Sequence, residues 1–247
     1  MQIIISPAKK MRDELDSLAP RSQPVFGQEA RQLAEWLKSL SYEELKERLS
    51  CSEAIARQNY ERYQKMDLTK NLSPAILSYE GIQYQYMAPG VFTYQEFDYL
   101  QQHLAILSGL YGLLRPFDGV RPYRLEMGTK LKAPFGENLY DFWGDRLARE
   151  LTKDDRVVVN LASWEYGRAV VRHLGEDAQC ITPVFGQLIG GKVVEKGVYV
   201  KMARGEMVRF LAERQGEEPQ VMQKFDALGY RYDPTRSDEK TYVFLKP

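Results

Sequence analysis

The chain has 247 residues, of which 44% are hydrophobic and 28% charged, and its 34 basic side chains balance 34 acidic ones. These proportions are typical of a soluble globular protein that buries its core without disulfide or metal crosslinks. They exclude a protein held to nucleic acid by bulk positive charge, but they are compatible with a local basic patch. The sequence shows no signal peptide and no apolar run near ~20 residues, and it contains only two cysteines. These features predict a cytoplasmic protein without a membrane partner.

Strands and helices alternate along the chain, as judged from the period of the apolar side chains. All-apolar runs are typical of buried strands, and apolar side chains three and four positions apart are typical of helices that pack on a sheet. Strands are predicted at residues 3–5, 104–107, 157–159, 181–189, 192–195, 198–202 and 242–244, the last at a sheet edge, and helices at residues 26–40, 42–49, 51–65, 94–103, 139–151, 164–173 and 206–215. This order indicates an α/β protein with one domain over residues 1–247, in which helices surround a mixed β-sheet.

A helical hairpin is predicted over residues 42–65, as an excursion from the sheet. Ser41 with Glu44, and Ser50 with Glu53, have the spacing of a capping box, so each pair is expected to open a helix. Short helix pairs can present backbone N–H groups to a DNA phosphate. The alternative interpretation is a hairpin that only packs, because its turn contains no glycine and carries an acidic residue.

A loop rich in glycine, proline and tyrosine follows the strand predicted at residues 104–107. It carries Arg115 and Arg124, and a stiff loop that presents guanidinium groups suits an anionic ligand. The alternative interpretation is a structural turn in which the arginines pair with Asp118 and Glu126.

Polar or basic side chains also follow three predicted strands at their carboxyl ends, where open α/β sheets usually bind ligands. Together with the arginine-bearing loop, they predict a pocket for phosphate or carboxylate in which tyrosines stack on a base. The residues of this predicted pocket are Ser6, Lys9, Ser108, Tyr111, Arg115, Tyr123, Arg124, Asn160, Ser163, Glu165, Lys201 and Arg204. The alternative is that these are ordinary loop residues exposed at strand ends.

Several other chemistries find no support in the sequence. It contains no phosphate-binding Walker motif and no dinucleotide fingerprint. Two histidines and two unpaired cysteines do not suggest a zinc site, so we expect neither a bound metal nor a cofactor. Cys51 and Cys180 are interpreted as buried or incidental.

Six motifs closely resemble the YaaA family of bacterial peroxide-stress proteins. They are Ile-Ser-Pro-Ala-Lys at 5–9, Leu-Ser-Gly-Leu-Tyr-Gly-Leu-Leu-Arg-Pro at 107–116, Pro-Tyr-Arg-Leu-Glu-Met-Gly at 122–128, Leu-Tyr-Asp-Phe-Trp-Gly-Asp at 139–145, Asn-Leu-Ala-Ser-x-Glu-Tyr at 160–166 and Lys-x-Ala-Arg-Gly at 201–205. They occur in order, and the resemblance covers residues 1 to about 232.

The resemblance implies a cytosolic protein that limits damage under hydrogen peroxide and is linked to lower free intracellular iron. It also implies DNA binding through a helix-hairpin-helix element and a basic cleft, on an unusual α/β fold. The helix-hairpin-helix would match residues 42–65, but Glu53 and Ala54 occupy a turn in which related proteins tend to carry a lysine. The basic cleft would map onto Lys9, Lys10, Arg115, Arg124, Lys201 and Arg204.

The leading interpretation is therefore a peroxide-stress protein that binds duplex DNA by its shape and helps to limit iron-dependent damage. The rival interpretation is an enzyme that acts on a nucleotide-like small molecule or a modified base. In that case Glu165 would be the acid or base, Lys9 and Arg124 would hold phosphate, and Tyr111 or Tyr123 would stack. A scaffold that binds only proteins is the third class considered.

Overall fold

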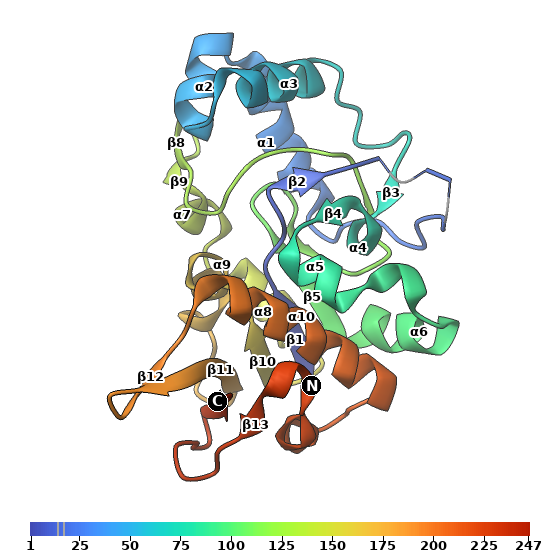
Figure 1. Ribbon diagram of the computed structural model, residues 1–247. Coiled ribbons are helices and arrows are strands. Elements are labelled where there is room, and N and C mark those ends of the chain that lie inside the picture. The colour runs from blue at the N-terminus through green and yellow to red at the C-terminus, as the bar shows by residue number, and fades with distance from the viewer. Residues whose placement is uncertain (14, 17) are drawn as a thin grey trace.

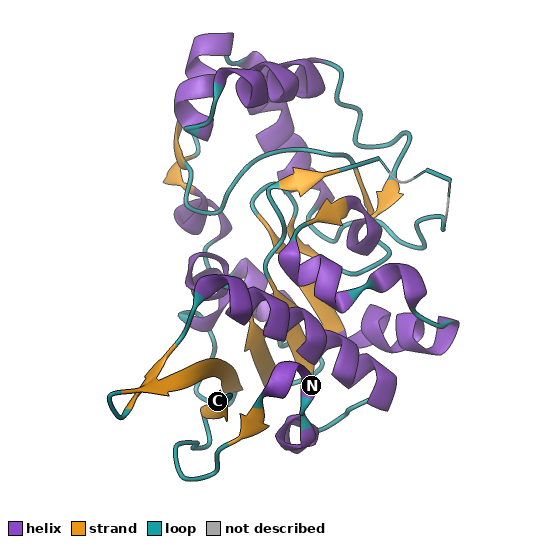
Figure 2. Ribbon diagram, in the orientation of Figure 1, coloured by secondary structure: helices purple, strands orange, loops and turns teal. Residues whose placement is uncertain are grey.

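The computed structural model describes residues 1–13, 15–16 and 18–247, and a mixed β-sheet lies at its centre (Figures 1 and 2). The strand order is β13-β14-β11-β10-β1-β5-β6, and β12 pairs with β11 off this path. The strands of this sheet are β1 (Gln2–Ile5), β5 (Leu104–Ser108), β6 (Gly112–Leu114), β10 (Val157–Leu161), β11 (Gln179–Ile189), β12 (Lys192–Val194), β13 (Arg231–Tyr232) and β14 (Thr241–Leu245). Three small strand pairs lie outside it: β2 (Lys10–Met11) with β4 (Tyr79–Glu80), β3 (Ser73–Pro74) with β7 (Gly119–Val120), and β8 (Lys130–Ala133) with β9 (Gly136–Asn138).

Ten α-helices and three short 3-10 helices complete the described part of the chain. The α-helices are α1 (Gly27–Ser39), α2 (Tyr42–Leu49), α3 (Glu53–Gln64), α4 (Ala75–Ser78), α5 (Ile82–Met87), α6 (Tyr94–His103), α7 (Leu139–Trp143), α8 (Arg146–Leu151), α9 (Trp164–Val171) and α10 (Gly197–Arg214). The 3-10 helices are η1 (Pro89–Val91), η2 (Pro219–Lys224) and η3 (Ala227–Gly229). Within the described residues, no helix combines the length and apolar character needed to cross a membrane.

The predicted α/β fold is confirmed, and β1 has the central place expected of its three isoleucines. Ile3, Ile4 and Ile5 are fully buried, and β1 pairs in parallel with β10 on one side and β5 on the other. A strand buried on both faces must be apolar on both faces, as this run is. Because β1, β5 and β10 run in parallel, their carboxyl ends meet at one edge of the sheet. That edge faces α2 and α3 in Figure 1.

Helices cover both faces of the sheet. Helix α6 packs on β1 and precedes β5, whereas α9 also packs on β1 and connects β10 to β11. The connection from β1 to β5 and the connection from β10 to β11 run in opposite directions along the sheet. Because such connections are right-handed, α6 and α9 lie on opposite faces. Helices α5 and α10 pack on each other on the face of α6, and α8 packs on α9.

The strand predicted at residues 198–202 is wrong, because this segment forms the first turns of α10. Its Val-Tyr-Val run favours a strand locally, but tertiary packing overrides that preference. At Gly205 the helix lies so close to α5 that an added Cβ would be 2.2 Å from the carbonyl oxygen of Gln83. Lys201 and Arg204 are therefore helix residues, and no strand end presents them.

Three smaller predictions also need correction. The helix predicted at residues 139–151 is two helices, α7 and α8, because Gly144 between them has φ of +53°. The predicted edge strand is second from the edge, since β13 covers the outer side of β14. Ser50 does not cap α3: it ends α2 in a left-handed conformation, and Ser52 takes the N-cap position without a side-chain hydrogen bond. The capping box of Ser41 and Glu44 at the start of α2 is confirmed.

Candidate functional site

Serine side chains hold the carboxyl ends of β1 and β10 together. Ser6 follows β1, and its hydroxyl oxygen accepts a hydrogen bond from the backbone N–H of Ser163 at 2.8 Å. The hydroxyl oxygens of the two serines are 3.1 Å apart. The two residues were predicted to lie in one pocket, and the structure does bring them into contact. These two hydrogen bonds join the two strand ends.

A segment from Tyr123 to Thr129 crosses these strand ends. The hydroxyl of Tyr63 in α3 donates to the carbonyl oxygen of Arg124 at 2.8 Å, and the backbone N–H of Gly128 donates to the carboxylate of Glu165 at 2.9 Å. We call residues 123–129 the strap. The strap is thus fixed to the helix pair on one side and to the start of α9 on the other.

One carboxylate on the strap holds two cations. The carboxylate of Glu126 lies 2.8 Å from the ammonium of Lys9 and 2.8 Å from the guanidinium of Arg124. The Lys9 side chain is 66% exposed, whereas that of Arg124 is only 13% exposed. Lys9 and Arg124 therefore meet at one place, as predicted, but Glu126 offsets half of their charge. The alternative interpretation of the loop, in which Arg124 pairs with Glu126 and Arg115 with Asp118, is also what the structure shows.

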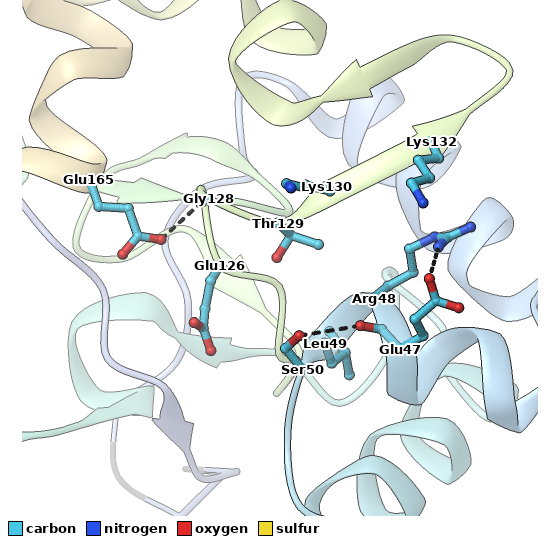
Figure 3. A pocket seen from close by; sticks show the side chains of 10 residues that line it. All are labelled: Glu47, Arg48, Leu49, Ser50, Glu126, Gly128, Thr129, Lys130, Lys132 and Glu165. Atoms are coloured by element: carbon cyan, nitrogen blue, oxygen red, sulfur yellow. Dashed lines mark hydrogen bonds and ion pairs between the residues drawn. The ribbon is translucent and has the colours of Figure 1, made fainter.

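Between the strap, the turn of the helix pair and β8 lies a pocket with a volume of about 640 Å³ (Figure 3). This volume falls within the range of small-molecule sites, roughly 300–1,000 Å³. Figure 3 shows the carboxylate of Glu165 on one side and the basic side chains of Arg48 and Lys132 on the other. The residues that line it are Glu47, Arg48, Leu49, Ser50, Glu126, Gly128, Thr129, Lys130, Lys132 and Glu165. We refer to it as the strap pocket.

The strap pocket has mixed electrostatics. Three carboxylates and three cations line it, and Lys9 and Arg124 add two further cations at Glu126. Cys51 lies next to the pocket-lining Ser50; burial raises the pKa of its thiol, and the Glu126 carboxylate acts in the same direction, against Arg124 and Lys46. The thiol is therefore protonated at neutral pH. Mixed charge of this kind suits a ligand with both phosphate and hydrogen-bonding groups better than a bare anion.

The two tyrosines predicted to stack on a ligand do not reach the pocket. Tyr111 and Tyr123 are only 2% and 3% exposed, because they pack edge to face on each other and Tyr123 also packs on Tyr79. The Tyr111 hydroxyl accepts a hydrogen bond from the backbone of Arg121, and the Tyr123 hydroxyl lies 2.6 Å from that of Ser108. Burial raises the pKa of Tyr123 to about 12. Both tyrosines and Ser108 therefore belong to the core, which corrects their place in the predicted pocket.

Arg115 lies at the other end of the strands. Its guanidinium pairs with the buried Asp118 at 3.1 Å, and it lines a separate cavity with Gln2, at the amino end of β1. It is therefore not part of the strap pocket. Lys10 pairs with Glu80 at 2.8 Å on the small sheet formed by β2 and β4.

The remaining predicted residues, Asn160, Lys201 and Arg204, do not line the strap pocket. The Asn160 side chain accepts a hydrogen bond from the N–H of Ala162 at 3.1 Å, within the turn after β10. Lys201 is exposed on α10. The guanidinium of Arg204 is largely buried: its pKa is lowered by this burial, against the field of Glu195, and its Nε has no partner among the described residues. Neither α10 residue lines the strap pocket.

Lys130 and Lys132, which were not among the residues of the predicted pocket, line the strap pocket in the structure. Lys130 and Lys132 lie in β8 on either side of the buried Leu131, so both point away from the core. Their alternation with an apolar residue was a readable strand signal. Their position opposite α2 depends on the tertiary fold. Among the described residues, no group of three or more His, Cys, Asp or Glu side chains is placed to hold a metal ion.

The fold and the site define an α/β protein with a mixed-charge pocket at the carboxyl ends of its central strands, closed on one side by a helix pair. Residues 1–236 match the family described as peroxide stress protein YaaA. The chain is 54% identical over 246 residues to a UPF0246 protein of Desulfitobacterium hafniense, covering 100% of this chain and 98% of that protein. It is also 49% identical over 246 residues to a UPF0246 protein of Lachnoclostridium phytofermentans, covering 100% and 96%. The chain belongs to the YaaA family of peroxide stress proteins.

Proposed function

We propose that this chain acts in the peroxide stress response by binding the phosphate backbone of DNA. The observation that carries the proposal is the gathering of five cations from four separate segments around the strap pocket. These cations are Lys9, Arg48, Arg124, Lys130 and Lys132. Lysine and arginine contacts to phosphate position a protein on DNA without reading its sequence. Recognition would therefore depend on the shape of the duplex.

The helix pair α2 and α3 contributes to the same surface in this proposal. Arg48 and Ser50 at the end of α2 line the pocket, and the N-terminus of α3 begins three residues after Ser50. Helix N-termini favour anions, and Ser52 leaves the first N–H groups of α3 without a side-chain cap. Glu53 in the first turn opposes a phosphate there. The helix pair is thus a weaker phosphate contact than the pocket cations.

Salt dependence tests the proposal directly. If about four phosphates are contacted, the logarithm of affinity falls with the logarithm of salt concentration at a slope of about −3.6. Replacing both Lys130 and Lys132 by Ala is expected to reduce that slope by about 1.8. Lys224→Ala is the matched control, because Lys224 is an exposed lysine of η2, which packs on α10 and β13. Affinity for duplex DNA that hardly responds to salt would contradict the proposal.

Protection against iron-dependent damage follows from the same contacts. Cations accumulate around DNA and are released when a protein neutralises its phosphates. A protein bound along the backbone would displace ferrous ions from the DNA, where each ferrous ion that is oxidised to ferric iron reduces hydrogen peroxide to a hydroxyl radical and hydroxide. The test is nicking of a supercoiled plasmid by ferrous iron and hydrogen peroxide. The protein is expected to slow nicking, whereas the Lys130→Ala/Lys132→Ala variant is expected to protect less at equal concentration.

A second candidate function is catalysis on a nucleotide or modified base. The observation that favours it is the presence of Glu126 and Glu165 on the wall of one pocket of about 640 Å³. Paired carboxylates in a ligand-sized pocket are suited to general acid and base roles. Glu165→Gln distinguishes the two functions. A DNA-binding surface would bind as well or better without this charge, whereas an enzyme would lose turnover.

A further inference from the structure

Exposed apolar side chains concentrate in one short segment of the chain. Five of the eleven large hydrophobic side chains that are exposed in the described residues lie within residues 188–199. They are Leu188, Ile189, Val194, Val198 and Tyr199, with exposed fractions between 37% and 53%. Clustered exposed apolar side chains mark a surface that binds a partner, whereas scattered single ones need no explanation. None of the five lines the strap pocket.

The segment begins with a hairpin that has an open edge. A two-residue turn at Gly190 and Gly191, with φ of +57° and +77°, joins β11 to β12. We call residues 187–195 the β-arm, and Figure 1 shows it extending from the edge of the molecule. Strand β12 pairs with β11 on one side, and on its other side it pairs with no strand of the described residues.

The register of the β-arm shows which backbone groups this open edge presents. Ile189 and Lys192 flank the two-residue turn and pair with each other, so they exchange both backbone hydrogen bonds. Hydrogen-bonded and non-hydrogen-bonded pairs alternate along an antiparallel ladder. The next residue, Val193, therefore points its N–H and C=O away from β11. An edge strand with free backbone groups is a template on which a further strand can pair.

The charge of the β-arm and the start of α10 selects the kind of partner. Lys192, Lys196 and Lys201 are exposed, and they form no ion pair with a described residue. The only acidic side chain in this part of the sequence is that of Glu195. Its carboxylate accepts a hydrogen bond from the backbone N–H of Phe185 at 3.3 Å, so it is turned toward β11. The charge presented to a partner is therefore positive.

We propose that the β-arm binds an extended, acidic segment of another protein, which adds to β12 as a further strand. Main-chain hydrogen bonds at Val193 hold the added strand, as in other cases of strand addition to a sheet edge. The apolar side chains of the partner cover those of the β-arm, and its carboxylates pair with Lys192. Opposite charges on neighbouring strands stabilise the pairing.

Two other occupants fit these observations less well. A second copy of this chain would bring the unpaired lysines of two β-arms close together, and like charges on neighbouring strands are destabilising. A membrane with anionic lipids would match the charge, but the N–H and C=O of Val193 would have no hydrogen-bond partner in its hydrocarbon. An acidic strand satisfies both the backbone groups and the charge.

Peptide binding to the whole protein tests the proposal. The probe is a fluorescein-labelled peptide of about six residues in which glutamate alternates with valine. We expect saturable binding by fluorescence anisotropy. The same peptide with every backbone nitrogen methylated is expected to bind at least about 10-fold more weakly, because it cannot donate main-chain hydrogen bonds. A peptide in which lysine replaces glutamate is expected to bind more weakly than the glutamate peptide.

Two variants locate the binding on the β-arm. Lys192→Glu is expected to weaken binding of the glutamate peptide about 3- to 10-fold and to strengthen binding of the lysine peptide. Lys224→Glu reverses an exposed charge on η2 and is the matched control, expected to change neither. Val193→Pro removes the outward N–H at an edge position that tolerates proline, and it is expected to weaken binding while the melting temperature stays that of the parent protein.

The outcomes decide between the occupants. Absence of saturable binding of the glutamate peptide would overturn the proposal, and so would equal binding of its methylated form. Unchanged binding of both peptides by Lys192→Glu would also overturn it. Cosedimentation with phosphatidylglycerol vesicles in place of peptide binding would assign the surface to a membrane. Self-association that Ile189→Ser abolishes, again without peptide binding, would assign it to a second copy.

Discussion

At the scale of single residues, Glu126 controls how much positive charge the site presents. Its carboxylate pairs with both Lys9 and Arg124 at 2.8 Å and lines the strap pocket. A DNA phosphate that approaches these two cations must compete with this carboxylate. In the proposed function, Glu126 would therefore weaken the binding of phosphate while it holds Arg124 in place.

Glu126→Gln is expected to strengthen binding to duplex DNA about 3- to 10-fold at low salt, because both cations lose a competing anion. Fluorescence anisotropy with a labelled duplex measures the change. Glu80→Gln is the matched control, since Glu80 pairs with Lys10 at 2.8 Å on the small sheet and not in the strap pocket. Weaker binding by Glu126→Gln would show that the pairing is needed to position Arg124.

The two cysteines are expected to react slowly with electrophiles at neutral pH. Burial raises the pKa of Cys180, and burial raises that of Cys51 against the opposing field of Arg124. The thiolate is the reactive form, so a raised pKa leaves less of it at pH 7 and moves the increase in rate to higher pH. Mass spectrometry after timed treatment with iodoacetamide checks this, with the urea-unfolded protein as the fast reference. Complete labelling of the folded protein within the time of the reference would contradict it.

At the scale of elements, α10 shows how tertiary contact overrides local preference. Its first turn carries the β-favouring Val198, Tyr199 and Val200, yet the segment is helical. Gly205 allows α10 to approach α5 closely, because a side chain there would meet the carbonyl oxygen of Gln83. The packing of the two helices stabilises the helical conformation of this segment. The helix then covers the sheet and keeps Arg204 largely out of solvent.

Gly205→Ala is expected to lower the free energy of unfolding by about 1–3 kcal/mol or more, since the added Cβ forces the two helices apart. Gly197→Ala is a matched control in the same helix: an added Cβ there meets nothing within 4 Å. This control is expected to be neutral or stabilising by less than about 1 kcal/mol. Urea unfolding followed by circular dichroism compares the two. Equal stability of both variants would mean that the helices separate without cost.

At the scale of the whole molecule, the site exists because the strap joins two parts of the chain. One end of the strap is bound by Tyr63 of the helix pair and the other by Glu165 of α9. The helix pair is thus tied to the carboxyl ends of the central strands. The strap pocket is the space enclosed by this arrangement.

Tyr63→Phe is expected to lower the free energy of unfolding by about 1 kcal/mol, because it removes the hydrogen bond to the Arg124 carbonyl. It should also weaken DNA binding, since the helix pair is then held less firmly over the pocket. Tyr60→Phe on the same helix is the control, because Tyr60 is half-buried and its hydroxyl makes no hydrogen bond among the described residues. Unchanged stability and binding in Tyr63→Phe would show that packing alone positions the helix pair.

The sequence by itself determined the α/β class, the central place of the isoleucine strand, the hairpin of β11 and β12, and the first capping box. These features depend on local periods and turn chemistry, which neighbouring residues specify. The motifs also identified the family.

The tertiary structure alone decided which polar residues share a pocket. Whether a tyrosine in a glycine-rich loop faces a ligand or the core depends on what packs against it, and Tyr111 and Tyr123 pack on each other in the core. Likewise, Lys130 reaches the site and Arg115 does not because the chain places them at opposite ends of the strands. The burial of a side chain and its pairing with a distant charge depend on many contacts between residues far apart in the sequence. No local sequence pattern specifies those contacts.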